Sequence, residues 1–451
     1  MGLVERLAVF NTLTRLVWRQ KSVNYSIFKA AVTIGSLTVV VKIVATFKEI
    51  LVANWFGTGD EIDAFLIAYL LAFFAVTIIA ESFNVALVPT FIQVREKKGL
   101  DAAKKLFSSA MLVALILLVI VSILLVLTAR YTLSVLGSGF DADKQKITQD
   151  LFYMLVPILT LRGLSSIWGA ILNADERFAL AAISPLLVPF MTLLALLLKK
   201  SVYMMTIGTV VGFAMETLLL ALSLRRNGFS PRPIWNGLTP ELRQVMGQYG
   251  PMVAGAFLMS STGLIDQSMA AALGSGSVAS LSYANRVVSL ILNVGSVAFG
   301  TAILPHFSKM LAQGNLAGVK STFRAYLGLI LVTSIPFMLF MIVFSESIVR
   351  ILYERGVFTS QDTKIVSEIQ IFYLLQIPFY LTGILIVRLI SSLKANHILM
   401  QGTVINILVN IGLNILFIRW LGIAGIALST TGVYIISVVF LSYRLWLRIK
   451  Q

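Results

Sequence analysis

Residues 42–91 read KIVATFKEILVANWFGTGDEIDAFLIAYLLAFFAVTIIAESFNVALVPTF, and this segment is the strongest indication of the fold. It contains two apolar runs that are long enough to cross a bilayer, which takes roughly 20 residues, and a Gly-rich turn at 57–59 joins them. The runs include five charged residues, which are Lys42, Lys48, Glu49, Asp63 and Glu81. A charge in hydrocarbon is costly unless it faces a partner or water, so these residues predict a polar cavity at membrane depth.

The composition indicates an all-α integral membrane protein. Of the 451 residues, 58% are hydrophobic and 12% are charged, whereas soluble domains carry about 25% charged residues. The chain has no Cys, and its two His residues, His306 and His397, lie far apart, so we predict no disulfide, no metal site and no bound cofactor. A net charge of +16 could indicate a protein that binds nucleic acid. Cytoplasmic loops of membrane proteins are rich in Lys and Arg, however, so we predict the lipid bilayer and no nucleic acid as partner.

The apolar runs predict about twelve transmembrane helices. They lie near 26–53, 62–92, 105–129, 150–172, 179–198, 203–224, 246–271, 279–311, 322–347, 367–392, 398–418 and 422–444. With a cytoplasmic N-terminus, the inside segments carry about twice as many Lys and Arg residues as the outside ones, so we predict both termini in the cytoplasm. Residues 1–24 have apolar residues at helical spacing, which predicts an amphipathic helix on the membrane surface.

The longest polar break predicts a boundary between two lobes. It reads RRNGFSPRPIWNGLTPELRQV at 225–245 and contains three Pro and two Gly residues. Such a segment is typical of a linker, here a cytoplasmic one between an N-lobe at 25–224 and a C-lobe at 246–451.

An internal repeat supports this division. FGTGDEIDAFLIAYLL from Phe56 is similar to LGSGSVASLSYANRVV from Leu273, and ALVPTF at 86–91 is similar to AILPHF at 302–307. Six predicted spans, an even number, separate the copies. We therefore predict two six-helix lobes in the same orientation, related by a pseudo-two-fold axis along the membrane normal.

The sequence shows no enzyme chemistry, and its main signal is charge within the spans. It lacks the patterns GxxxxGK[ST] and GxGxxG and any hydrolytic or redox group of residues, so we predict no catalytic residue and no enzyme. Lys42 and Lys48 are six residues apart, about 9 Å along a helix, and can border one cavity. Arg286 lies in the second copy of the repeat. Such cations suit a multivalent anion, for example a pyrophosphate between a lipid and a sugar.

Other interpretations of the charges stay open. Glu49 and Asp63 lie near the outer ends of their spans and could cap a helix or reach the interface, as could Lys48. Glu216 and Asp266 could be ordinary interhelical partners of basic residues.

Five segments carry a resemblance to a known family. They are KEILVANWFGTGDEIDAF (48–65), GAILNADERF (169–178), GSGSVASLSYANRVVSL (274–290), GTAILPHFSKMLAQGN (300–315) and LYERGVFTSQDT (352–363). The chain resembles the MviN/MurJ family, the lipid II flippases within the multidrug/oligosaccharidyl-lipid/polysaccharide exporter superfamily. The resemblance implies two lobes in a V around a cationic central cavity, in the bacterial cytoplasmic membrane. It also implies transport of an undecaprenyl-pyrophosphate-linked saccharide to the outer leaflet by alternating access.

The family's motifs also imply substrate-binding residues. They are Lys42 and Lys48 in place of two first-helix arginines, the following Glu49, Asp63 of a TDAF-like turn, and Arg286 of a YA-x-R motif. The chain departs from the family where an Arg pair usually precedes the AE motif, because Val76 and Thr77 stand there. The last two of about fourteen family spans are also absent. These departures leave room for a related cargo, such as an exopolysaccharide or capsule unit.

We therefore expect a flippase for a lipid-linked saccharide, acting as a monomer. Membrane potential, Na⁺ or H⁺ could drive it, with Glu81, Glu216 and Asp266 as candidate coupling residues. The alternatives are a cation-coupled multidrug antiporter of the same superfamily and a non-transporting scaffold in cell-envelope assembly.

Overall fold

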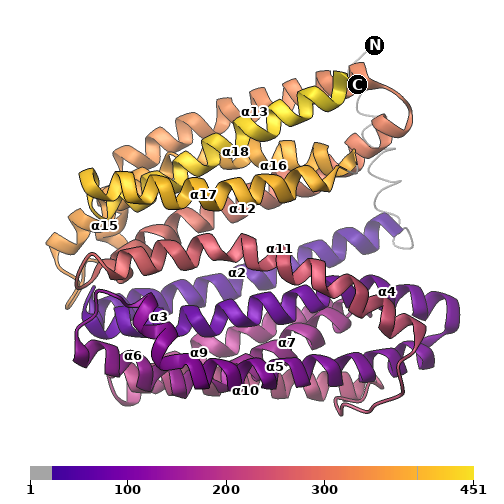
Figure 1. Cartoon of the computed structure of the whole chain (residues 1–451), viewed down its shortest axis with the longest axis horizontal. Coiled ribbons are helices and arrows are strands. Elements are labelled where there is room, and N and C mark those ends of the chain that lie inside the picture. Colours follow the sequence, from indigo (N-terminus) through magenta and orange to yellow (C-terminus); the bar gives the residue numbers. More distant parts are fainter. Residues whose placement is uncertain (1–22, 394, 451) are drawn as a thin grey trace, which may run out of the picture. The chain divides into compact units, whose positions relative to one another are not determined.

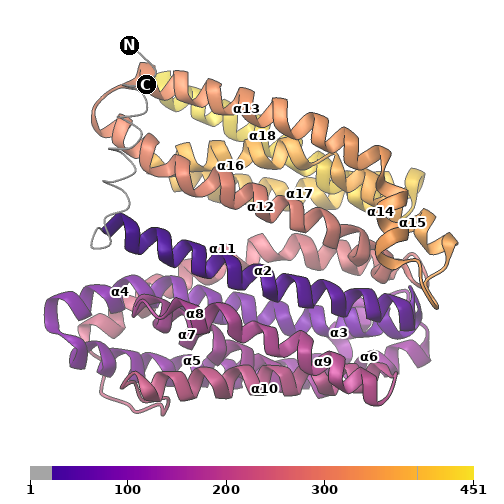
Figure 2. The ribbon, with the colours of Figure 1, turned by 180° about the vertical axis from the view of Figure 1, so that it is seen from behind.

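The computed structural model describes residues 23–393 and 395–450, and this part of the chain contains helices and no strand (Figure 1, Figure 2). The helices of the first half are α2 (Val23–Phe56), α3 (Asp60–Val76), the π-helix η1 (Thr77–Glu81), α4 (Ser82–Lys98), α5 (Leu100–Leu136), α6 (Ala142–Leu155), α7 (Pro157–Ala174), α8 (Phe178–Ile183), the 3₁₀ turn η2 (Ser184–Leu186), α9 (Leu187–Leu198) and α10 (Val202–Arg226). Those of the second half are α11 (Pro240–Ala271), α12 (Ser277–Ala312), α13 (Leu316–Val343), α14 (Ser345–Tyr353), α15 (Ser360–Leu374), α16 (Ile377–Ser392), α17 (Asn396–Leu421) and α18 (Ala424–Lys450). The predicted all-α class is confirmed.

Many of these helices can cross a membrane. Within the described residues, eight helical segments are long and apolar enough, or nine if α6 and α7, which meet at a bend of 43°, form one span. Three further predicted spans lie on α2, α11 and α12, which are 34, 32 and 36 residues long. The multi-pass architecture is thus confirmed, whereas the count of twelve spans is not. The predicted surface helix at 1–24 lies almost entirely outside the described residues.

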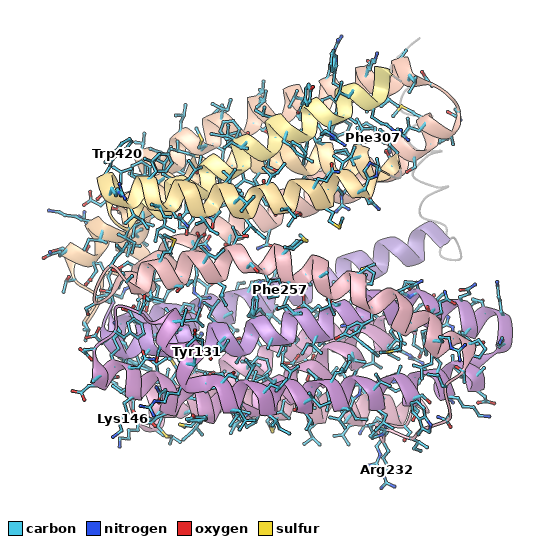
Figure 3. All side chains as sticks on the ribbon, viewed as in Figure 1. Tyr131, Lys146, Arg232, Phe257, Phe307 and Trp420 are labelled. Carbon is cyan, nitrogen blue, oxygen red and sulfur yellow. The ribbon has the colours of Figure 1, made fainter. Side chains whose placement is uncertain are left out.

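Large apolar side chains on the outer surfaces of the helices fit a lipid environment. Leu198 is 81% exposed. Tyr131 is 76% exposed and Trp420 is 72% exposed (Figure 3). Such side chains would be unfavourable in water over so many helices, and a bilayer removes that cost. Charged side chains such as Lys146 and Arg232 project outward from the ribbon (Figure 3).

The chain divides into two compact units. Among the described residues, unit 1 contains those up to Glu49 together with Ile79–Val119 and Pro157–Tyr249, and unit 2 contains Ile50–Ile78, Ile120–Val156 and the chain from Gly250. Unit 2 therefore holds residues from both halves of the sequence. The predicted lobes at 25–224 and 246–451 have other borders and stay a prediction.

Unit 1 has an aromatic and aliphatic core that also binds part of the 225–245 segment. Phe229 from this segment packs against Phe91 and Phe107, each with 6.1 Å between ring centroids. Ser108 of α5 then accepts a hydrogen bond from the backbone N–H of Ile234 at 2.9 Å. Neighbouring Ser109 accepts one from the N–H of Asn236 at 3.0 Å. The predicted linker is thus held along α5 for part of its length.

Unit 2 is built around α12, which packs against α3, α13, α15 and α16. Tyr283 of α12 lies in an aromatic cluster with Tyr353 at 5.1 Å and Phe358 at 5.7 Å between ring centroids. The helices α17 and α18 pack along one another (Figure 1). This arrangement brings the turn at 57–59 to the start of α12, where the buried Asp63 is found.

The helices are interrupted at three places where the chain passes between the units. The π-helix η1 contains the border between Ile78 and Ile79, Val156 separates α6 from α7 at the border before Pro157, and Pro251 follows the border at Tyr249 within α11. A proline inside a helix removes one backbone hydrogen bond, and a π-helix shifts the pattern locally. Regular α-helical bonding is therefore already broken at these borders.

Candidate functional site

The predicted substrate-binding cations lie in different units. In unit 1, Lys42 of α2 has an exposed side chain, and Lys48 pairs with Glu49 at 2.5 Å. Glu49 is buried, with 8% of its surface exposed. In unit 2, Arg286 of α12 has an exposed side chain beside the buried Val287. The structure describes each group within its own unit, so the joint site predicted for them stays a prediction.

Asp63, at the start of α3, is the most completely bonded buried charge of unit 2. Its carboxylate is fully buried, and one oxygen accepts from Lys144 Nζ at 2.8 Å and from the backbone N–H of Gly276 at 2.8 Å. The other oxygen accepts from the N–H of Ala279 at 2.7 Å. Gly276 is the N-cap of α12 and has no side chain to cap it, so Asp63 performs this role from another helix.

Lys144 reaches Asp63 because of its place on α6. The buried face of α6 consists of Lys144, Thr148, Leu151, Phe152 and Leu155, at the spacing of one helical stripe, and α6 packs against α3. The ammonium also binds Asp60 at 2.6 Å and lies 4.1 Å from the ring centroid of Phe140. Lys144 has 5% of its side chain exposed, so its charge is stabilised by these two carboxylates and the ring.

Further contacts join the two halves of the sequence beside this cluster. The hydroxyl of Thr58 donates to Asp362 at 2.5 Å, the N–H of Val357 donates to the carbonyl of Asn54 at 3.0 Å, and the hydroxyl of Tyr283 donates to the carbonyl of Gly57 at 3.2 Å. Together with the bonds of Asp63, these three contacts form what we call the clasp. The clasp ties the 54–63 segment to α12, to the turn before α15 and to the first turn of α15.

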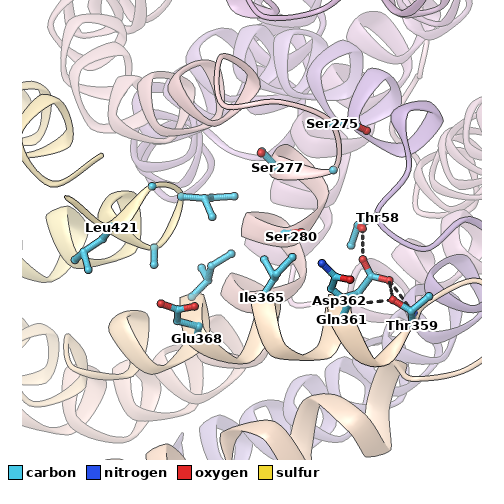
Figure 4. Close-up of a pocket in the computed structure, with 15 residues that line it drawn as sticks. Thr58, Ser275, Ser277, Ser280, Thr359, Gln361, Asp362, Ile365, Glu368 and Leu421 are labelled. Atoms are coloured by element: carbon cyan, nitrogen blue, oxygen red, sulfur yellow. Dashed lines mark hydrogen bonds between the residues drawn. The ribbon is translucent and has the colours of Figure 1, made fainter. Parts of the chain in front are cut away.

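A cavity of about 510 Å³ lies next to the clasp (Figure 4). Thr58 and Asp362 lie at one end of it, and Glu368 and Leu421 lie at the other. Hydroxyl, amide and carboxylate groups line it together with apolar side chains, and the lining includes no Lys or Arg. Such a lining does not suit a pyrophosphate, which cationic donors bind. This cavity is therefore not where we place the phosphate site.

Asp266 of α11 lies in a buried cluster of neutral groups. One carboxylate oxygen accepts from the side-chain amides of Asn410 at 3.0 Å and Asn414 at 2.8 Å, both on α17. The other oxygen is 3.4 Å from the hydroxyl of Thr430 on α18. The cluster thus joins three helices around one carboxylate, with several side-chain oxygens close by and no cation among the partners that the structure gives it.

The remaining predicted coupling residues lie in unit 1. Glu81 ends the π-helix η1 and is exposed. Glu216 of α10 is 2% exposed, and its nearest cation is Arg162 of α7, at 3.4 Å. Among the described residues, no group of three or more His, Cys, Asp or Glu residues could hold a metal ion.

Comparison with known proteins places the chain in a family. The sequence pattern of the family described as Lipid II flippase MurJ matches residues 52–450. The chain belongs to the lipid II flippase MurJ family. The match includes Asp63, Arg286 and Asp266 but begins after Lys42, Lys48 and Glu49, so these three positions rest on the sequence resemblance alone.

Proteins of similar sequence carry the name of the same family. A probable lipid II flippase MurJ of Rhizobium tropici is 26% identical over 422 residues, which is 90% of this chain and 78% of the relative. The protein of the same name from Thermotoga maritima is 25% identical over 405 residues, or 90% of this chain and 82% of the relative.

Solved structures show the same fold. A lipid II flippase MurJ in an inward closed conformation has a TM-score of 0.78 and 24% identity, covering 92% of this chain and 87% of that structure. An inward-facing multidrug resistance transporter of the MATE family has a TM-score of 0.76 and 14% identity, covering 90% of this chain and 94% of that structure. The fold is therefore shared across the superfamily, and it does not by itself separate lipid from drug transport.

Three polar positions of the buried clusters escaped the sequence analysis. Lys144 lies between the predicted spans at 105–129 and 150–172, and the signal that could have placed it is its position on the apolar face of the 142–155 helix. Asn410 and Asn414 are spaced i, i+4 on α17, a mostly apolar helix that also carries Asn406 one turn earlier, and this spacing puts the amides on one face. Such a pair in a span predicts a polar partner on a neighbouring helix.

Proposed function

We propose that this MurJ family protein is a flippase that moves an undecaprenyl-pyrophosphate-linked saccharide, lipid II or a related cell-envelope precursor, from the inner to the outer leaflet. The observation that carries this proposal is the family match over residues 52–450. Exposed cations on long membrane helices, Lys42 and Arg286, support it because a pyrophosphate needs such partners. A transporter of this kind changes the position of its substrate and makes or breaks no covalent bond.

Within this proposal, Lys42, Lys48 and Arg286 bind the pyrophosphate, and Glu49 modulates Lys48 through their ion pair. Asp63 acts through the clasp, since its two oxygens already hold Lys144 and the start of α12. With the turn at 57–59 on the outer side and both termini in the cytoplasm, the clasp closes the outer end of unit 2. Release to the outer leaflet then requires the clasp to open, as alternating access demands.

The cluster around Asp266 is the proposed ion-coupling site. Na⁺ is bound by oxygen ligands, and the Asp266 carboxylate, the Asn410 and Asn414 amide oxygens after rotation of the amides, and the Thr430 hydroxyl offer such a set. Thermal unfolding of the purified protein tests this assignment. NaCl should raise the Tm relative to choline chloride at equal ionic strength, and the shift should be absent in Asp266→Asn. An equal shift in both proteins would assign the effect to another site.

Transport itself is tested in vesicles that contain the purified protein and a fluorescent lipid-linked saccharide. Movement across the bilayer should be lost in Arg286→Ala and reduced in Lys42→Gln, while both variants insert and elute from gel filtration as the unaltered protein does. Full activity of a normally inserted Arg286→Ala protein would contradict the proposed role of this residue. The multidrug antiporter is not favoured, since the MATE structures are 14% identical and share only the fold.

A further inference from the structure

The pair formed by Arg162 and Glu216 is incompletely bonded for a charge pair in a membrane helix bundle. Arg162 Nη1 lies 3.4 Å from Glu216 Oε1, whereas charge-assisted hydrogen bonds are usually about 2.7–2.9 Å long and often bidentate for arginine. The second oxygen of Glu216, Oε2, is buried and has no hydrogen-bond partner among the described residues. Glu216 is therefore held by one long contact, although only 2% of its surface is exposed.

Four elements that pack closely against α10 among the described residues offer Glu216 no other cation. Packed against α10 in unit 1 are α7, α8, η2 and α9, and Arg162 is the only charged side chain on these four elements. On α10 itself, Arg225 and Arg226 lie more than two turns away, in its last turn. The charge of Glu216 thus depends on Arg162, because a buried carboxylate without a partner is strongly unfavourable.

Arg162, in contrast, has more hydrogen-bond donors than its contact with Glu216 uses. A guanidinium carries five N–H donors, and the contact to Glu216 is the one hydrogen bond that the described residues give this side chain. The side chain is 25% exposed. One turn later on α7, Ser166 accepts from the amide of Asn84 on α4 at 2.8 Å, so the side of α7 that carries both residues approaches α4.

The register of α4 and α7 brings a second carboxylate to the same level. Asn84 contacts Ser166, and Arg95 contacts Asp175 at 3.2 Å, so the two helices run in the same direction. Glu81 precedes Asn84 by three residues, as Arg162 precedes Ser166 by four. Arg162 therefore lies at one level with two acidic residues, one buried and one exposed.

We propose that Arg162 is a further anion-binding residue and that Glu216 occupies its guanidinium when no anion is bound. A phosphate group can satisfy several guanidinium donors at once, which a single carboxylate oxygen at 3.4 Å does not. When the anion takes Arg162, the buried carboxylate of Glu216 takes up one proton from water and forms an O–H bond, so no unpaired charge remains. Anion binding and proton uptake are then linked, and each promotes the other. This inference rests on the proposed function, since the anion is the phosphate of the lipid-linked substrate.

The test measures binding of undecaprenyl pyrophosphate to the purified full-length protein. Glu216→Gln keeps the shape of the side chain but frees Arg162, so affinity should rise about tenfold at a pH of about 8. The same substitution in an Arg162→Gln background should give no gain. Glu346→Gln is the matched control, because it removes an exposed carboxylate of α14 and changes the net charge equally, and it should leave affinity unchanged.

Calorimetric titration in two buffers with different ionisation heats adds an independent readout. Binding to the unaltered protein should take up about one more proton than binding to Glu216→Gln. Arg162→Lys retains the positive charge and is the control for Arg162→Gln. Thermal unfolding of both variants shows whether a change in affinity in Arg162→Gln reflects a loss of folding. A change in affinity below about twofold in Glu216→Gln, or an equal gain in the Arg162→Gln background, would overturn the inference.

These outcomes are separable from failure of the proposed function. If Lys42→Gln and Arg286→Gln abolish binding of undecaprenyl pyrophosphate while Glu216→Gln and Arg162→Gln leave it unchanged, the proposed function stands and the role of Arg162 is excluded. If neither the unaltered protein nor any variant binds the probe, and no lipid-linked saccharide moves in vesicles, both proposals fail.

Discussion

Asp63 in unit 2 and Glu216 in unit 1 are both buried carboxylates beside a basic side chain, yet their surroundings differ. Both oxygens of Asp63 are bonded, at 2.7 and 2.8 Å, to two backbone N–H groups and an ammonium. Glu216 has one contact at 3.4 Å and one oxygen without a described partner. Burial alone therefore does not reveal the role of a charge. A fully bonded carboxylate fixes structure, whereas a partly bonded one retains the capacity to exchange partners.

Asp63→Ala should produce the largest effect of the changes considered. It leaves Lys144 buried with only the half-exposed Asp60 as a carboxylate partner and removes the cap of α12. Breaking one side of a buried ion pair typically costs about 3–5 kcal/mol, which chemical or thermal unfolding in detergent would measure. Asp63→Asn is the control of similar shape, and it should lose less. If Asp63→Ala unfolds as the unaltered protein does, the contrast with Glu216 fails.

Gly276→Ala should weaken the same cluster from the other side. Gly276 has φ of +78°, and a Cβ there would meet the carbonyl oxygen of Thr58. The left-handed backbone and the clash together should cost about 1–3 kcal/mol of unfolding free energy. Gly274→Ala provides the matched comparison, because its φ is +116° but a Cβ there meets nothing within 4 Å. Equal losses in the two variants would show that backbone strain alone, and not the contact with Thr58, matters.

Glu216→Gln should change stability by less than about 1 kcal/mol, since it sacrifices one long contact and the remaining Arg162 is partly exposed. Its expected effect is on binding and proton uptake instead. Unfolding of Asp63→Asn and Glu216→Gln side by side makes the comparison quantitative. A loss at Glu216 as large as that at Asp63 would indicate that both carboxylates are structural.

The smallest effect is expected at an exposed pair, which serves as the reference for the buried ones. Glu241, at the start of α11, accepts a hydrogen bond from Lys98, and this bond lowers the pKa of the Glu241 carboxyl below its usual 4.5. Because the folded pKa is the lower one, the contribution to stability is present above pH 4.5 and is lost as the pH falls through the folded value. Glu241→Gln should lower the Tm by less than about 2 °C at neutral pH, and the difference should vanish in acid.

The sequence predicted the class of the fold and less of the site. Apolar runs of membrane-spanning length identify helices because lipid leaves the backbone no other partner, and each predicted span falls on helical segments. The clasp could not be predicted, because the pairing of Asp63 with Lys144 and with the start of α12 depends on how segments distant in sequence meet. The repeat did relate the turn at 57–59 to that at 274–276, and these turns lie next to one another in unit 2.

Charges within the spans were easier to find than to interpret. A charged side chain is energetically unfavourable in lipid, so Asp266 and Glu216 stand out in their apolar spans. Both residues are buried in the structure. The partners were not predictable from hydropathy: neutral amides surround Asp266, and one arginine lies near Glu216. Lys42, Lys48 and Arg286 were identified as cations for an anionic cargo, and their roles stay predictions.

The interruptions at η1, at Val156 and at Pro251 have a mechanical consequence. Bending a regular helix weakens backbone hydrogen bonds, and in lipid no water replaces them. An intact helix therefore resists bending. Where the hydrogen-bond ladder is already broken, a change of angle breaks no further bond. Compliance is thereby concentrated at three short positions, and the helices between them can behave as rigid rods.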